Sequence, residues 1–427
     1  MKKKIIISIT LVLILTVSIS SLVFGAEEEI DILFHTCGYG RVIRDMLPEF
    51  EEEYGIKVNY HEVNVGVIHQ KVQLEWAAKS GAYDVVNIAS LPPMIESGGL
   101  LSLDEYIDKA DPDWLNLDDF LPTNADLMQY EGSWYGLPVR NDTRLMHINT
   151  EMFEEAGLEP EAPETFSEMV TAAKKLTDHS EDQAGMIMGY KGAYPYDWAL
   201  ATFIRGFGGE FFDDNMRPTF DSPQAIEGVE LYVDLMREHD VVPEDAMNID
   251  HPAQCSALLN GRGAMNMNVP ARWADQFDED ISKVSGEIES FPVPEGPAGR
   301  APLAGAWSLS IMSDSEAPEA AWKFIVWATS TDVQKRAIQA GGDCNPTRYS
   351  VIEDPELQEE YSVFKAIQES AGTAKPNPQF GASTQVSDIL NKAVRKAAAG
   401  EVSVEEAMKN AADNTEQLLD ALGYYDE

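Results

Sequence analysis

The amino-terminal part of the chain alternates short apolar strands with amphipathic helices. Residues 29–36, 56–63 and 83–88 are apolar runs of strand length, and residues 41–55 and 68–81 repeat apolar side chains at helical spacing. Strand, helix, strand, helix, strand is the order typical of a parallel sheet covered by helices, so the sequence predicts an α/β fold. Helices dominate after residue 150, and a chain of 427 residues is expected to form more than one domain.

The first 25 residues are expected to be a secretory signal peptide. Three lysines precede the apolar stretch Ile5–Phe24, and Gly25 offers a small residue for cleavage. An uncleaved anchor is the alternative, because this stretch is nearly long enough to span a bilayer. No cysteine follows the apolar stretch, so attachment of a lipid is not expected.

The chain is strongly acidic. It carries 73 Asp and Glu residues against 31 Lys and Arg residues, a formal net charge of −42 at pH 7. Such a surface repels nucleic acid and anionic lipid, so no nucleic-acid partner is expected. It suits either a very salty habitat, where salt screens the self-repulsion, or the binding of many cations. Scattered acids on helix faces favour the salty habitat.

Catalytic and metal-binding signatures are absent from the sequence. It contains no GxSxG, Walker, HExxH or EF-hand motif, and acidic pairs are too abundant to indicate a glycosidase. The three cysteines, Cys37, Cys255 and Cys344, lie far apart and lack metal-ligand spacing. One disulfide is possible, but buried free thiols are the favoured interpretation. The residues alone therefore indicate no catalytic, cofactor or metal site.

A polar segment interrupts an apolar run in "GLPVRNDTRLMHIN", residues 136–149. Arg140, Asp142 and Arg144 separate two runs that otherwise read as strand pieces. This segment is either a solvent loop or a crossing between two domains beside a polar ligand. These residues alone leave both interpretations open.

Aromatic residues supply a second signal. Tyr196, Asp197 and Trp198 follow one another in a loop flanked by Gly and Pro, and Trp307 stands in "GAWSLSI" after two small residues. Sugars have apolar C–H faces and a rim of hydroxyls, so they bind to flat aromatic rings with nearby polar partners. Packing in the core is the alternative for Trp307.

Several segments together resemble the extracellular solute-binding proteins of sugar ABC transporters, in particular the maltose-binding-protein-like group. They occur in the family's order between residues 30 and 350: "YDVVNIAS", "GLPVRNDTRLMHINTEMFEEAGLE", "DWALATFIRGFGGEFFDDNMRPTFDSP", "GRGAMNMN", "GAWSLSI" and "GGDCNPTRYS". The resemblance implies a periplasmic-binding-protein-like fold, with two α/β lobes around a ligand cleft and crossover strands as the hinge. It places the crossovers at the polar segment, near "PLAGAW" and near "GGDCNPTR".

The resemblance also implies the extent of each lobe and the ligand contacts. The amino-terminal lobe would comprise residues 27–141 plus 304–343, and the carboxy-terminal lobe residues 142–303 plus 344–427. Contacts are implied at the ends of strands and in loops facing the cleft, at His35, Gly38, Asn87, Ser90, Arg140, Asp142, Arg144, Tyr196, Asp197, Trp198, Asn268, Trp307 and Asp343. Bracing of the hinge is the alternative role for Arg140, Asp142 and Arg144.

The function that the resemblance implies is that of a monomeric periplasmic receptor. It would bind a sugar or sugar alcohol by hinge closure and deliver it to the membrane permease of an ABC importer. The missing lipid-attachment cysteine favours the periplasm. An exported glycoside hydrolase is one alternative and needs a carboxylate pair in the cleft. A receptor for a cationic solute such as a polyamine is another, against which Arg140 and Arg144 argue.

Overall fold

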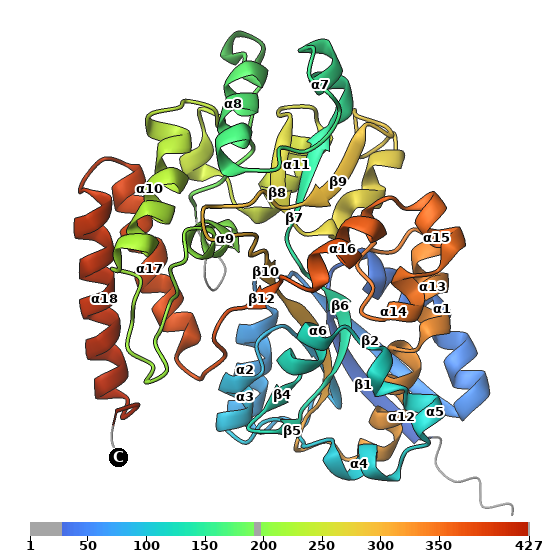
Figure 1. Ribbon diagram of the computed structural model, residues 1–427. Coiled ribbons are helices and arrows are strands. Elements are labelled where there is room, and N and C mark those ends of the chain that lie inside the picture. Colours follow the sequence, from blue (N-terminus) through green and yellow to red (C-terminus); the bar gives the residue numbers. More distant parts are fainter. Residues whose placement is uncertain (1–27, 192–197, 426–427) are drawn as a thin grey trace, which may run out of the picture.

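The chain folds into two α/β lobes, one below the other in Figure 1. The computed structural model describes residues 28–191 and 198–425, and within them it omits the side chains of residues 198, 271, 272 and 274. We call the five-stranded sheet with its helices the first lobe, and the three-stranded sheet with its helices the second lobe. No helix within these residues is long and apolar enough to cross a membrane.

The first lobe is built on a mixed sheet with the strand order β2-β1-β3-β11-β6. Its strands are β1 (Glu28–His35), β2 (Ile56–Val63), β3 (Val85–Ile88), β6 (Leu137–Asn141) and β11 (Ala306–Ile311). The first three are parallel, as the sequence predicts, whereas β11 is antiparallel to both β3 and β6. Local pattern predicts a strand at β11 but could not reveal that it joins this sheet, because that strand returns from the other lobe.

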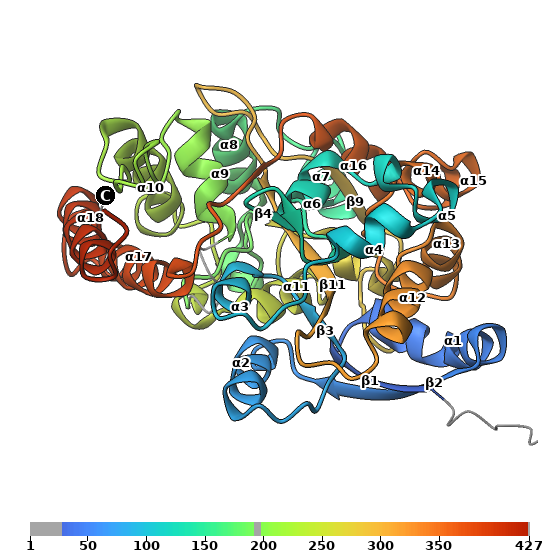
Figure 2. The same cartoon turned by 90° about the horizontal axis from the view of Figure 1, so that it is seen from below.

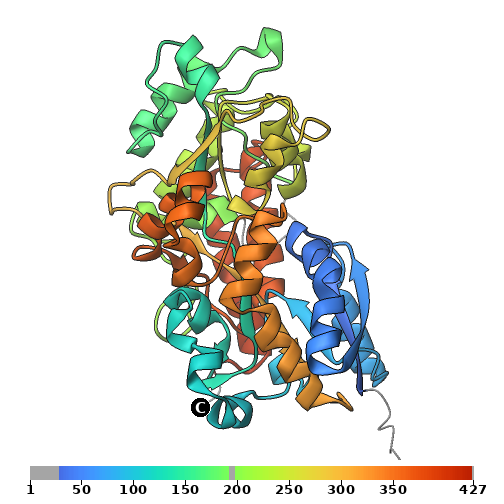
Figure 3. The same cartoon turned by 90° about the vertical axis from the view of Figure 1, so that its right-hand side faces the viewer.

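Helices cover both faces of this sheet. They are α1 (Gly38–Tyr54), α2 (Ile68–Ala78), α3 (Pro92–Glu96), α4 (Asp104–Lys109), α5 (Pro112–Leu115), the 3-10 turn η1 (Leu117–Asp119), α6 (Pro122–Leu127), α12 (Pro318–Ala328) and α13 (Thr331–Gln339). A small hairpin, β4 (Gln129–Tyr130) with β5 (Ser133–Trp134), lies at the edge. Helix α1 ends at Gly55, whose φ of 68° favours glycine. In Figure 3 the blue α1 lies beside the orange α12 and α13, against which it packs.

The second lobe is built on an antiparallel sheet of β7 (Leu145–Asn149), β8 (Met265–Asn268) and β9 (Ile288–Pro292), with β7 in the middle. Its helices and 3-10 turns are α7 (Thr150–Glu155), α8 (Phe166–Leu176), η2 (His179–Glu181), α9 (Trp198–Gly206), α10 (Pro223–Arg237), η3 (Ala246–Asn248), α11 (His251–Leu259) and η4 (Pro270–Phe277). Local sequence explains their starts: Thr165 and Glu168 form a capping box before α8, and Ser222 caps α10.

The carboxy-terminal helices pack back over the molecule. They are α14 (Tyr349–Ile352), α15 (Pro355–Glu360), α16 (Val363–Ala371), α17 (Ser383–Ala398) and α18 (Val404–Ala421). Helices α17 and α18 pack on α10 of the second lobe and lie at one side of Figure 2. Helix α16 packs on β9, whereas α14 contacts α13 of the first lobe. A short parallel pair joins this region to the segment that leads back into β11. It consists of β10 (Leu303–Ala304) and β12 (Lys375–Pro376).

The chain crosses between the lobes where the polar segment stands. Strand β6 belongs to the first sheet and β7 to the second, and the two follow one another through the centre of Figure 1. Other crossing segments run alongside: the amide of Asn141 donates to the carbonyl of Asn345 at 2.9 Å, and the amide of Asp142 to Gly305 at 2.8 Å. The polar segment is therefore a crossing between lobes rather than a solvent loop.

All three cysteines are free thiols. Cys255 and Cys344 are buried, and Cys37 is half-buried at the start of α1, where its sulfur accepts from the amide of Gly40. The favoured interpretation of the cysteines, free thiols rather than a disulfide, is the one observed.

Candidate functional site

A polar cluster lies at the crossing between the lobes, centred on Arg140 at the end of β6. Nε of Arg140 lies 2.9 Å from Oδ1 of Asp142, and Nη1 lies 2.9 Å from Nε2 of His35 and 3.7 Å from Oδ2 of Asp343. Arg140 and His35 end two strands of one sheet, β6 and β1, whereas Asp142 follows β6 and Asp343 lies in the segment after α13, so side chains far apart in sequence meet. One guanidinium thus faces two carboxylates.

Trp307 of β11 is part of the same cluster. Its Nε1 donates to Oδ2 of Asp142 at 2.9 Å, and its ring lies 3.9 Å from the ring of His35 and 5.5 Å from that of His69, between centroids. The indole is only 2% exposed and belongs to the core of the first lobe. Trp307 therefore holds Asp142 in place from inside the core, and it offers no open face to solvent.

His35 is neutral at pH 7. Burial and the charge of Arg140 lower its pKa well below the usual 6.5. Because a guanidinium can only donate, Nε2 of His35 accepts from Arg140, which leaves the proton on Nδ1 facing Oδ1 of Asn87. The amide of Asn87 donates in turn to the carbonyl of Ser308 at 2.8 Å. Each of these buried groups has its orientation fixed by a neighbour.

Asp343 closes the cluster at the start of α1. Its Oδ1 accepts from the amide of Gly38 at 3.1 Å, and a Cβ on Gly38 would lie 2.5 Å from that oxygen, so a larger residue here would displace the carboxylate. Burial raises the pKa of Asp343, while Arg140 lowers it. Within the described residues Oδ2 of Asp343 has no hydrogen-bond partner, although the residue is only 8% exposed.

Arg144 and Asn268 lie apart from this cluster, inside the second lobe. Nη1 of Arg144 donates to Oδ1 of Asn268 at 2.7 Å, and Nδ2 of Asn268 approaches Sγ of Cys255 at 3.2 Å. Both residues are 2% exposed. Our argument against a cationic ligand, which took Arg140 and Arg144 as positive charges facing the cleft, is therefore wrong. Arg140 is offset by two carboxylates, and Arg144 is buried against Asn268.

Ser90 lies in a different place again, in a pocket of about 230 Å³ between the lobes, which we call the interlobe pocket. Most of the lining comes from the first lobe, and Thr384 in the first turn of α17 comes from the other side. The lining residues are Val65, Gly66, His69, Gln70, Val72, Gln73, Ile88, Ser90, Pro93, Met94 and Thr384. His69 also contacts Trp307, so the pocket adjoins the cluster.

The predicted aromatic loop lies mostly outside the described residues. Tyr196 and Asp197 lie outside the described residues, and of Trp198 the structure gives the backbone at the start of α9 but not the side chain. Sequence analysis missed His69 and Asn345, whose amide donates to Asp142 at 3.2 Å. The segment "GGDCNPTR" pointed to the region of Asn345, whereas no spacing rule singles out His69.

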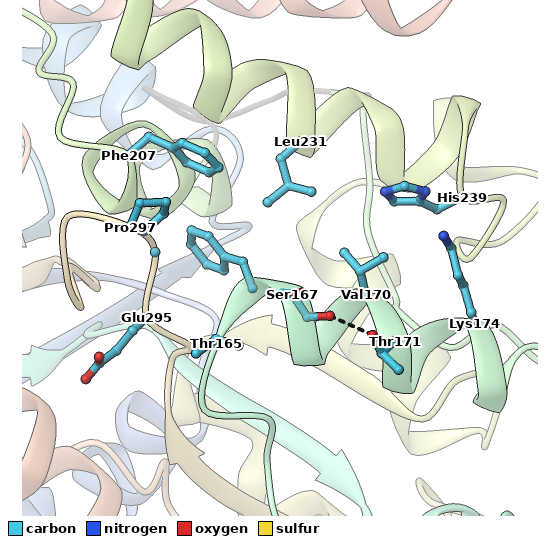
Figure 4. Close-up of a pocket in the computed structure, with 12 residues that line it drawn as sticks. Thr165, Ser167, Val170, Thr171, Lys174, Phe207, Leu231, His239, Glu295 and Pro297 are labelled. Carbon is cyan, nitrogen blue, oxygen red and sulfur yellow. Dashed lines mark hydrogen bonds between the residues drawn. The ribbon is translucent and has the colours of Figure 1, made fainter.

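A larger cavity of about 700 Å³ lies away from the crossing, between α8 and α10 of the second lobe. Figure 4 shows Val170, Leu231 and Phe207 around it, with Lys174 and His239 together at one end. We call it the α8–α10 groove. Within residues 28–191 and 198–425, no group of three or more His, Cys, Asp or Glu side chains could hold a metal ion.

Comparison with known proteins agrees with this architecture. Residues 39–335 match the family model for bacterial extracellular solute-binding proteins. The chain is 26% identical to a probable amino-acid ABC transporter periplasmic-binding protein of Sinorhizobium fredii, covering 88% of this chain and 86% of that protein. It is 24% identical to the mannitol-binding protein of Pseudomonas aeruginosa, covering 88% and 89%.

Among solved structures, the maltose-bound MalE3 of T. maritima superimposes with a TM-score of 0.82 at 27% identity, covering 92% of this chain and all of that chain (100%). The relatives are binding proteins by name. Since the family model spans well over half of the sequence, the chain belongs to the bacterial extracellular solute-binding protein family.

Proposed function

We propose that this protein is a periplasmic receptor for a neutral carbohydrate, a sugar or a sugar alcohol, which it delivers to the permease of an ABC importer. Relatives named for mannitol and maltose support this ligand class. The proposal includes export through the signal peptide of residues 1–25, a monomeric state and no chemical conversion of the ligand. Closure of the two lobes on the ligand would present the loaded form to the permease.

The observation that supports a ligand hydroxyl in the polar cluster is Oδ2 of Asp343, which lies 3.7 Å from Arg140 but accepts no hydrogen bond from the described residues. A buried carboxylate oxygen without a donor is costly, and a ligand hydroxyl can supply that donor through a strong, charge-assisted hydrogen bond. The choice of a neutral ligand rests on the relatives named for mannitol and maltose and not on repulsion by Arg140, because Asp142 and Asp343 together outweigh its charge.

The proposed lobes are residues 27–141 plus 304–343 and residues 142–303 plus 344–427. The sheets support this division, since β1 to β6 and β11 fall in the first set and β7 to β9 in the second. The boundary would then pass through the polar cluster. A ligand seated there can contact both lobes, which is the requirement for coupling binding to closure.

Calorimetry against neutral sugars, sugar alcohols, amino acids and polyamines tests the proposal. We expect binding of one or more neutral carbohydrates, and Asp343→Asn should weaken it by about 10- to 150-fold, the value of a hydrogen bond to a charged group. Asp214→Asn, an exposed carboxylate on the second lobe, is the matched control and should bind normally. Binding of amino acids or polyamines alone would refute the ligand class.

The absence of chemistry needs its own measurement. The bound carbohydrate should be recovered intact by chromatography after long incubation with the protein. Products that increase in proportion to the protein concentration would assign the chain to the glycoside hydrolases instead.

A further inference from the structure

The α8–α10 groove has the size and the wall of a ligand site, although it lies away from the crossing between the lobes. Its volume of about 700 Å³ falls within the roughly 300–1,000 Å³ of small-molecule pockets. Such pockets combine an apolar wall with a few polar groups that orient the ligand. Two helices and two connecting segments supply the apolar wall here, through Phe166, Val170, Phe207, Leu231 and Pro297.

The groove is elongated along helix α8. Phe166, Val170 and Lys174 are spaced four residues apart, so they lie on one face of this helix. The helix from Phe166 to Lys174 covers about 12 Å at roughly 1.5 Å per residue. Figure 4 shows Leu231 of α10 across the groove from α8. A straight chain of about ten carbons, joined by bonds of about 1.5 Å, matches this length better than a compact ring does.

One end of the groove offers hydrogen-bond donors. Lys174 and His239 lie together there in Figure 4, and neither side chain has a hydrogen-bond or ion-pair partner within the described residues. The ammonium group of Lys174 carries a positive charge and three donors, and the ring of His239 adds at least one N–H donor. Two neighbouring donors of this kind suit the two oxygens of a carboxylate.

Two acidic residues beside the groove face other partners. Glu295 lines it, but its carboxylate lies 3.5 Å from Arg300 and points away from the cavity in Figure 4. The carboxylate of Asp240, at the end where Lys174 stands, lies 3.4 Å from Nε2 of His179. The net charge of −42 opposes any anion at long range. Salt screens that repulsion beyond about 10 Å, so a carboxylate in contact with Lys174 is still favoured.

We infer that the α8–α10 groove is a second binding site, for an unbranched aliphatic monocarboxylate of about ten carbons. The alkyl chain would lie between α8 and α10 against the apolar wall, and the carboxylate would accept hydrogen bonds from Lys174 and His239. All lining residues belong to the second lobe, so this ligand would have the same affinity for the open and the closed form. The site is therefore independent of the carbohydrate proposed for the cleft.

Calorimetry with decanoate and decan-1-ol, both below the concentrations at which they aggregate, tests the contact with the carboxylate. The unchanged protein should bind a single decanoate. Lys174→Met should weaken decanoate binding by about fivefold, the upper value for an exposed ionic contact, and decan-1-ol binding by less than about twofold. Lys175→Met is the matched control and should change neither affinity. It removes the same charge one residue further on, where Nζ donates to the carbonyl of Gly157 at 3.2 Å outside the groove.

A second pair of variants tests the apolar wall. Leu231→Ala should weaken the binding of decanoate and of decan-1-ol alike, by about 3- to 30-fold, because the alkyl chain loses part of its contact with three carbons. Leu422→Ala is the matched control, since Leu422 is an exposed leucine that follows α18 and lies outside the groove. It should leave both affinities unchanged. Leu231 is half-buried, so its variant should fold, as circular dichroism would verify.

Several results would overturn the site. Decanoate that does not bind, or that binds in many copies per chain, has no defined place on the protein. An equal loss of decanoate affinity in Lys174→Met and Lys175→Met would mean that Lys174 makes no specific contact. Unchanged affinity in Leu231→Ala would place the alkyl chain elsewhere. The carbohydrate proposed for the cleft is tested separately, because none of these measurements involves it.

Discussion

The interlobe pocket and the α8–α10 groove are both hollows of this chain, and the larger one has the weaker case for the transported ligand. The groove holds about 700 Å³ against about 230 Å³ for the interlobe pocket. Its lining residues all belong to the second lobe, from Thr165 to Pro297. A ligand shifts a conformational equilibrium only by its difference in affinity for the two states. A ligand bound within one lobe has the same affinity for the open and the closed state, so it cannot favour closure. The volume of a hollow is therefore a poor guide to the site of the transported ligand.

The two hollows also differ in what lies behind them. Phe166 and Phe207, stacked 6.0 Å apart, line one part of the groove, and Lys174 and His239 lie together at one end. The interlobe pocket is backed by the buried polar cluster, in which His35 and Asp142 are oriented by hydrogen bonds. Substitutions behind the interlobe pocket should therefore cost more stability and more affinity than substitutions in the groove.

The largest effect is expected for Trp307→Ala. The indole is buried and holds Asp142, so its removal should lower the free energy of unfolding by about 3–5 kcal/mol. Leu231→Ala in the groove should cost less than about 2 kcal/mol, because this side chain is half-exposed and only part of its burial is lost. Denaturant titration of both variants measures the difference. A smaller loss for Trp307→Ala than for Leu231→Ala would contradict the comparison.

Affinity supplies the second readout for the same pair. Trp307→Ala should weaken carbohydrate binding, since Asp142 and through it Arg140 lose a support beside Asp343. Leu231→Ala should bind as the unchanged protein does. Weaker binding by both variants to the same degree would mean that the groove communicates with the cleft.

Local sequence was sufficient to predict the elements whose stabilising contacts are local. The strands up to Ile88 and the capped helices α8 and α10 follow from apolar spacing, Thr165 and Ser222. The antiparallel pairing of β11 could not be predicted from spacing, because its partners Asn87 and Arg140 lie more than 160 residues earlier in the chain. Only the resemblance to a known family pointed to that return.

The residues expected to contact a ligand lie together only in part, and their surroundings differ from one another. His35, Asn87, Arg140, Asp142, Trp307 and Asp343 come together, which the resemblance implied. The sequence could not show that two carboxylates offset the charge of Arg140 or that Arg144 is buried, because charge pairing depends on distances across the sheet. It could not indicate His69 and Thr384 either. Each lies on a helix without a distinctive motif, and only the packing of the two lobes brings them to one pocket.

The next largest effect expected is a dependence of the free energy of unfolding on pH. Burial lowers the pKa of His147, behind the cleft in β7, to about 4. The unfolded chain, with a histidine pKa near 6.5, binds the proton first as pH falls. Stability should therefore decrease as pH falls from about 6.5 toward 4, and this one group should contribute roughly 2 kcal/mol of loss between pH 7 and pH 5.

The variant His147→Gln isolates that contribution. Its unfolding free energy should depend less on pH between 7 and 5 than that of the unchanged protein, by the amount given above. Denaturant titrations at several pH values measure both slopes. An identical pH dependence in the two proteins would show that His147 does not titrate as its burial requires.

The smallest effect concerns the bond between the lobes beside the interlobe pocket. Oε1 of Glu96 accepts from the amide of Gly381 at 2.9 Å and from the hydroxyl of Tyr130 at 2.8 Å. Because Glu96 is exposed, this bond should be worth about 1 kcal/mol. Glu96→Ala should therefore speed hydrogen exchange at the Gly381 amide by about fivefold, the rate equivalent of that energy.

Glu105→Ala, an exposed carboxylate of the first lobe that pairs with Lys109, is the control and should leave the exchange unchanged. The α8–α10 groove, which lies within one lobe, should keep its amide protection in both variants. Unchanged exchange at Gly381 in Glu96→Ala would mean that this contact does not hold the lobes together, and the interlobe pocket would then depend on the ligand alone for its closure.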